Sequence, residues 1–146
     1  MSELFGYEYD DGGRGKYFPK KAGGDCVCRA IAIVAGMDYM KVYNMLKENM
    51  KCNPDRGINC NDRRFRKLMD RLGFRYGVAP GRAAILRAGE LPSKGRYVCL
   101  TKRHAIAVID GVVHDTFDSR FSYSLFGKRV KERTIYGYFK YDTNLR

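Results

Sequence analysis

The amino-acid sequence predicts an α+β domain, with helices in the first half of the chain and an antiparallel sheet in the second. Between residues 26 and 72, apolar residues recur three and four positions apart, which is the spacing of one helix face. After residue 92 the apolar residues form short runs that are typical of strands. The pair Asp110-Gly111 separates two of these runs and is a strong signal for a two-residue hairpin turn.

Three helices are expected in the first half. The first covers residues 26–35, where Asp25 is a suitable N-cap and Gly36 a suitable residue after the last turn. It is apolar on nearly all sides, which predicts a buried helix. A second helix begins after Asp38, and a third covers residues 61–72 and carries many arginines.

The remaining residues are expected to supply strands and loops. The expected strands are residues 74–78, 97–100, 104–109, 112–116 and 135–141. Residues 83–88 are expected to form a helical turn, and residues 118–131 a polar, basic loop. Residues 1–23 are interpreted as an irregular arm, which precedes a single domain over residues 24–146.

Length, charge and hydropathy exclude several classes of protein. The chain has 146 residues, which fits one domain, and no run of eighteen apolar residues, so neither a spanning helix nor a membrane partner is expected. The first eleven residues are polar and acidic, unlike a secretory signal, which favours the cytoplasm and reduced thiols. The five cysteines contain no Cys-x-x-Cys pair, so neither a metal nor another cofactor is expected.

The formal charge is strongly positive. Lys and Arg number 28 against 16 Asp and Glu, which gives +12. Such a charge suits nucleic acid or an acidic protein as a partner, although charge alone specifies no reaction. The candidate polyanion-binding residues lie on the third helix and in the basic loop: Arg63, Arg64, Arg66, Lys67, Lys128 and Arg129.

Cys26 is the candidate nucleophile because it opens a predicted buried helix. Unpaired amides and the helix dipole at that end favour a thiolate over a thiol. A cysteine nucleophile needs a base, and His104 opens a predicted strand. In a hairpin that turns at Asp110-Gly111, Asp115 lies one diagonal step from His104 and can orient its ring, with Asp118 as an alternative acid.

Two segments carry a resemblance to a known family. Gly-Asp-Cys-Val-Cys-Arg-Ala-Ile-Ala-Ile at residues 24–33 resembles the Asp-Cys helix of papain-like cysteine peptidases, nearest to the double-glycine-leader peptidases of bacteriocin exporters. Residues 104–116, a His-led strand, a turn and a strand ending in Asp, resemble their second signature. The chain also resembles short phage and bacterial proteins that share these segments, over roughly residues 24–140.

The resemblance implies a papain-like fold and a cysteine peptidase or amidase that acts on a peptide or protein substrate. Cys26 would be the nucleophile, His104 the base and Asp115 the orienting acid. The exporter peptidases carry an oxyanion-hole Gln six residues before the nucleophile, where this chain has Lys20, and a Gly after it, where this chain has Val27. For a phage protein the location would be the host cytoplasm.

These departures leave two alternatives to hydrolysis open. One is a papain-like binding protein without catalysis, whose basic surface takes nucleic acid or an acidic host protein. The other is acyl transfer to an amine instead of water.

Overall fold

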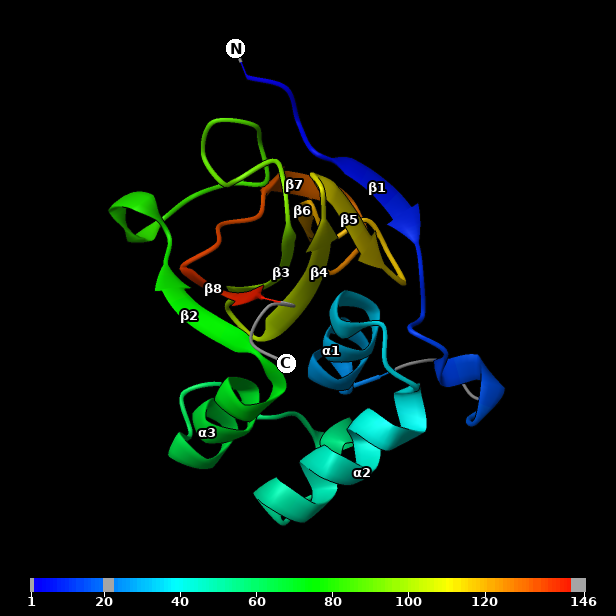
Figure 1. Ribbon diagram of the computed structural model, residues 1–146. Helices are drawn as coiled ribbons and strands as arrows, with labels where there is room; N and C mark the ends of the chain where they lie inside the picture. The colour runs from blue at the N-terminus through cyan, green and yellow to red at the C-terminus, as the bar shows by residue number, and fades with distance from the viewer. Residues whose placement is uncertain (1, 20–22, 143–146) are drawn as a thin grey trace.

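The computed structural model describes residues 2–19 and 23–142, which form three α-helices around a mostly antiparallel sheet (Figure 1). The helices are α1 (Cys26–Ala35), α2 (Tyr39–Met50) and α3 (Arg63–Leu72). The strands are β1 (Gly6–Tyr9), β2 (Phe74–Val78), β3 (Arg96–Thr101), β4 (His104–Ile109), β5 (Val112–Asp115), β6 (Phe121–Tyr123), β7 (Arg129–Glu132) and β8 (Gly137–Tyr141). The α+β class predicted from the sequence is confirmed.

The main sheet has six strands in the order β1-β5-β4-β3-β8-β2. Each neighbouring pair is antiparallel except β1 with β5. The hairpin of β4 and β5 turns at Asp110-Gly111, and its register pairs Ile109 with Val112 and Ala107 with His114, as the turn predicts. This register directs His104 and Asp115 toward each other.

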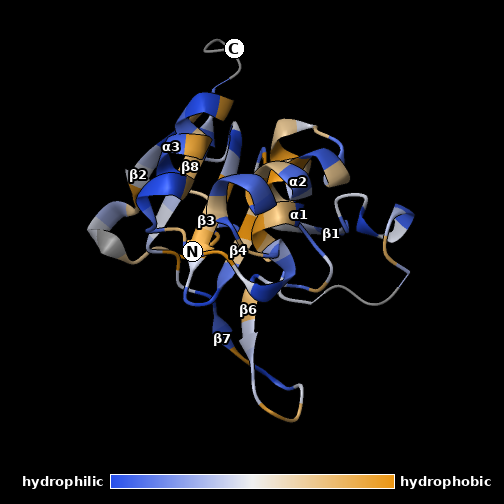
Figure 2. Cartoon of the chain, turned by 90° about the horizontal axis from the view of Figure 1, so that it is seen from below, coloured by the Kyte–Doolittle hydropathy of each residue, from blue (hydrophilic) through white to orange (hydrophobic). Residues whose placement is uncertain are grey.

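Helix α1 is the central helix and packs against β4 and β3 (Figures 1 and 2). Eight of its ten residues are buried, which confirms the expectation of an apolar, buried helix. Ile31 and Val34 join Leu100, Ala105 and Phe139 in the main core. Because the helix is held on the sheet along its length, its first residue has a fixed position relative to β4.

The expected irregular arm over residues 1–23 is wrong for residues 6–9. These residues form β1, which lies parallel to β5 and pairs Tyr9 with Asp115. Phe5 just before it is buried. Sequence patterning missed this strand because three of its four residues are exposed or polar, and its pairing comes from more than a hundred residues further along the chain.

Two further expectations are wrong. Residues 83–88 form no helical turn, because Ala84 pairs instead with Ile135 in an isolated β-bridge. The expected loop over residues 118–131 contains β6 and part of β7, which form a separate two-stranded hairpin that projects from the body (Figure 2). In the described residues, no helix has both the length and the apolar character needed to cross a membrane.

Candidate functional site

Cys26 is the first residue of α1, and its side chain lines a cleft of about 450 Å³. The first hydrogen bond of the helix runs from the Arg29 amide to the Asp25 carbonyl. The amides ahead of Arg29, including that of Cys26, are therefore outside the intrahelical ladder. The thiol thus lies where the helix dipole favours negative charge.

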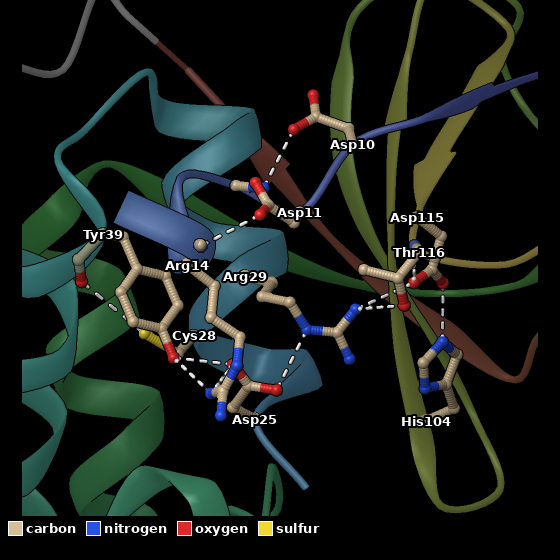
Figure 3. Close-up of polar contacts among 12 residues, drawn as sticks. Asp10, Asp11, Arg14, Asp25, Cys28, Arg29, Tyr39, His104, Asp115 and Thr116 are labelled. Carbon is tan, nitrogen blue, oxygen red and sulfur yellow. Dashed lines mark hydrogen bonds and ion pairs between the residues drawn. The ribbon is translucent and has the colours of Figure 1, made fainter. Parts of the chain in front are cut away.

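His104 opens β4 and lines the same cleft, and its ring nitrogen Nε2 lies 2.7 Å from Oδ2 of Asp115 (Figure 3). Asp115 is the last residue of β5 and is only 3% exposed. Because Nε2 faces Asp115, Nδ1 is the ring nitrogen left for the Cys26 thiol, which lines the same cleft as His104. The structure thus brings all three predicted residues together.

Mutual interaction shifts the pKa values of the thiol and the imidazole in opposite directions. Burial alone would raise the pKa of Cys26, but the hydrogen bond and positive charge of His104, with the Ala105 amide, outweigh burial and lower it. Burial alone would lower the pKa of His104, but the hydrogen bonds to Asp115 and Cys26 raise it to about 9. Each group therefore favours the charged form of the other, a thiolate beside an imidazolium.

Other thiols lie in environments that keep them protonated. Burial raises the pKa of Cys28, Cys60 and Cys99 to about 12. Cys28, two residues from the candidate nucleophile, points away and donates to the Tyr39 carbonyl at 3.7 Å. Cys26 and Cys28 belong to the same helix, so what distinguishes Cys26 from Cys28 is its position at the start of that helix.

A buried arginine ties the carboxylate of Asp115 to α1. Arg29 is 6% exposed; its Nε donates to Asp25 at 3.0 Å, and its Nη1 donates to Asp115 at 3.1 Å and to the Thr116 hydroxyl at 3.0 Å (Figure 3). Thus Oδ1 of Asp115 is held by Arg29 and Oδ2 is left for His104.

Asp25 does not cap α1 with its side chain, which corrects the expected N-cap. It is completely buried and accepts hydrogen bonds from Arg14 at 2.8 Å, from Arg29 at 3.0 Å and from the Tyr39 hydroxyl at 2.6 Å (Figure 3). The sequence analysis missed these roles of Asp25 and Arg29. The signal was available, because Arg29 follows Asp25 by four residues, the spacing of a helical ion pair.

Two further predicted site residues are Asp118, the alternative acid, and Lys20, the candidate oxyanion residue. Asp118 is bound by the guanidinium of Arg120, at 2.8 and 2.7 Å, and within the described part of the chain its carboxylate makes no hydrogen bond or ion pair with His104. Asp115, not Asp118, is the carboxylate on His104. Lys20 lies outside the described residues.

Three of the six candidate polyanion-binding residues have structural partners. Arg64 pairs with Asp62 at 2.9 Å. Arg66 donates to the Cys60 carbonyl at 2.8 Å and lies over the Tyr76 ring, 3.7 Å from its centroid. Arg129 lies over Phe121 at 3.8 Å. The remaining three are exposed: Arg63, Lys67 and Lys128. Arg66 thus serves to anchor the loop before α3, which lines the cleft.

Comparison of the chain with known protein families, with curated proteins and with solved structures found no significant match.

Proposed function

We propose that this protein is a papain-like thiol hydrolase that cleaves an amide bond in a peptide or protein substrate, in the cytoplasm of a phage host. The observation that supports this best is that a thiol at a helix N-terminus shares a cleft with an imidazole bound to the buried carboxylate of Asp115, and that this imidazole lowers the pKa of the thiol. In this arrangement, nucleophile, base and orienting acid have the mutual contacts that covalent acyl transfer requires.

In the first half of the reaction, the Cys26 thiolate attacks the carbonyl carbon. The carbonyl π electrons move to oxygen, and the resulting oxyanion is stabilised by unpaired amides at the start of α1. His104 then gives its Nδ1 proton to the leaving amine as the carbon–nitrogen bond breaks, leaving an acyl-thioester on Cys26. Asp115 keeps its bond to Nε2 throughout and so fixes the ring.

In the second half, neutral His104 takes a proton from water, and the resulting hydroxide equivalent attacks the thioester carbonyl. Collapse of the second tetrahedral intermediate breaks the carbon–sulfur bond, releases the acid and restores the thiolate–imidazolium pair. An amine that takes the place of water would give acyl transfer, and mass analysis of the products distinguishes the two reactions.

The alternative of a binding protein with a basic surface has less support. Arg64, Arg66 and Arg129 are engaged within the protein, as described above. Neither a salt-dependent surface nor nucleic-acid binding explains why a thiol, an imidazole and a buried carboxylate are aligned in a cleft.

The test is the pH dependence of Cys26 alkylation by iodoacetamide, measured by peptide mass spectrometry, with exposed Cys52 as the internal comparison. An ordinary thiol has a pKa near 8.5, so its labelling falls about tenfold per pH unit below pH 7.5. Cys26 is expected to fall much less steeply. His104→Ala removes the hydrogen bond and charge that lower its pKa, so the variant should give Cys26 a steep profile.

A second measurement uses cleavage. Incubation with a proteome-derived peptide pool should create new amino termini that are absent with Cys26→Ala, and His104→Ala should slow their formation by about 10²- to 10⁴-fold. A steep Cys26 profile in the wild type, or cleavage that survives Cys26→Ala, would contradict the proposal.

A further inference from the structure

We infer that the cleft takes an acidic peptide segment, with carboxylate side chains on both sides of the bond that reacts with Cys26. This inference rests on the proposed function and adds a substrate class to it. It depends on charged side chains that line the cleft but take no part in the proposed reaction.

The two walls come from different parts of the chain. One is the segment of residues 55–61, between α2 and α3, and the other is the turn between β3 and β4 with its flanking residues. Cys26 and His104 belong to the same lining. Apolar side chains of Val27, Leu100 and Tyr136 complete it. A peptide bound over Cys26 therefore lies in a cleft to which both segments contribute.

Each wall carries one arginine. Arg56 lies on the first wall and Arg103 on the second, and both are exposed. Among the described residues, neither guanidinium makes a hydrogen bond or ion pair with a carboxylate. An unpaired guanidinium offers a planar fork of donors that matches a carboxylate.

The only acidic residue among the described lining residues is Asp55, and its carboxylate already has a partner. This carboxylate lies near the Tyr43 hydroxyl and, after burial, its charge contributes to raising the pKa of Tyr43. The negative charge of a Cys26 thiolate is cancelled by the positive charge of a His104 imidazolium. With the one carboxylate of Asp55 against the two guanidiniums of Arg56 and Arg103, the lining that a substrate meets has a net positive charge.

The backbone that carries each arginine is held in place by packing or by hydrogen bonds. A Cβ on Gly24 would overlap the Asp55 carbonyl oxygen, so the first wall is packed directly against the turn before Cys26. Arg66 holds the far end of that wall through its bonds to the Cys60 carbonyl and the Asn61 side chain. Arg103 lies in the two-residue turn between the paired residues Thr101 and His104.

A peptide fits this chemistry better than a nucleic acid does. The atom that meets the sulfur must be an acyl carbon, and phosphate linkages provide none. Neutral amide side chains on the first wall, Asn59 and Asn61, and unpaired amides at the start of α1 are suited to a peptide backbone. We therefore assign the two cations to carboxylate side chains of Asp or Glu.

The test compares two alkylating agents of similar size, anionic iodoacetate and neutral iodoacetamide, on the full-length protein at low salt. The ratio of their rates at Cys26, divided by the same ratio for N-acetylcysteine, measures attraction of an anion by the cleft. Arg56→Gln and Arg103→Gln should each reduce it by roughly two- to fivefold, the scale of an exposed ion pair, and 0.5 M salt should reduce the wild-type ratio. Arg75→Gln, an exposed arginine of β2 outside the lining, is the matched control.

A second measurement distinguishes peptide from nucleic acid. Hexaglutamate should protect Cys26 from iodoacetamide, hexaglutamine should not, and the protection should disappear in the Arg56→Gln/Arg103→Gln double variant. Equal protection by an oligodeoxynucleotide would overturn the assignment to peptide. A rate ratio that stays unchanged in both single variants would overturn the inference while leaving an activated Cys26 intact. Failure of the proposed function would appear instead as a steep pH profile of Cys26 with iodoacetamide.

Discussion

At the scale of single residues, the candidate chemistry depends on which groups surround a thiol rather than on the thiol itself. Cys26 and Cys28 are two residues apart on one helix, yet the pKa of Cys26 is lowered whereas that of Cys28 is raised to about 12. The difference comes from His104, whose ring is held by Asp115, and from the position of Cys26 at the start of α1.

Arg29 connects this chemistry to the core, which leads to a prediction about stability. Arg29→Met removes the partner of two buried carboxylates, Asp25 and Asp115. Losing one partner from a buried ion pair typically costs about 3–5 kcal/mol. We therefore expect the free energy of unfolding to fall by about that amount in urea denaturation.

Arg29→Lys is the matched control, because it keeps the charge but cannot donate to both carboxylates in the same fork geometry. Its unfolding free energy should lie between those of the wild type and Arg29→Met. If Arg29→Met unfolds at the same urea concentration as the wild type, the bridge contributes no stability and this account of the network is wrong.

At the scale of elements, the cleft depends on a close approach between two segments. Gly24, at a φ of +71°, lies against the Asp55 carbonyl oxygen with no room for a side chain. A left-handed φ favours glycine, and the close contact allows nothing larger. The turn before α1 and the segment before α3 are therefore fixed relative to each other at this point.

Gly24→Ala should consequently destabilise the protein by about 1–3 kcal/mol and slow Cys26 alkylation at pH 6.5, because the Asp55 wall must move. Gly23→Ala is the control, since a Cβ there meets no atom within 4 Å. Its effect on unfolding should be below about 1 kcal/mol. If urea unfolding shows that Gly24→Ala and Gly23→Ala lower the free energy of unfolding equally, the close contact between Gly24 and the Asp55 carbonyl does not constrain the fold.

At the scale of the whole molecule, the charge of +12 is distributed over several structural roles. Some arginines, such as Arg29 and Arg66, hold the interior and the cleft loop. Others stabilise the projecting hairpin of β6 and β7, whose base is tied by Arg120 to Asp118 and by Arg133 to the Phe121 carbonyl. The excess positive charge therefore cannot be assigned as a whole to a polyanion partner.

The paired titration of His104 and Cys26 predicts how stability depends on pH. The raised pKa of His104 contributes stability that is present in full below about 6.5, its unfolded value, and is lost as pH rises through about 9. The lowered pKa of Cys26 contributes stability that is present in full above about 8.5 and is lost as pH falls through its folded value. Where the two ranges overlap, the two contributions change with pH in opposite directions.

Cys26→Ala leaves only the slope of His104, whose pKa stays raised by Asp115. The variant should therefore lose stability relative to the wild type as pH rises from about 6.5 to 8, by at most about 1.4 kcal/mol per pH unit. Urea unfolding at half-unit steps of pH measures both slopes. Parallel slopes for the two proteins would contradict the thiolate–imidazolium pair.

Local patterns in the sequence predicted much of the fold and part of the site. Helix α1 begins and ends as its apolar run and flanking residues predict, and the Asp110-Gly111 turn fixed the register that aligns His104 with Asp115. Strand β1 and the hairpin of β6 and β7 were missed, because their residues are largely exposed and carry no apolar pattern. Their pairing is determined by partners distant in the chain or by arginine contacts at the hairpin base.

By itself, then, the sequence determined the α+β class, the helix that carries Cys26 and the hairpin that brings His104 to Asp115, because periodicity and turn chemistry act over a few residues. Only the tertiary structure decided which groups surround them. It buried Asp25 and turned it from an expected cap into an acceptor for three side chains, and it placed Arg29 between Asp25 and Asp115. It also brought Arg56 and Arg103 into the lining of one cleft. Apart from the Asp25–Arg29 pair, whose spacing of four residues is visible in the sequence, these contacts join residues on different elements, and local patterns carry no information about them.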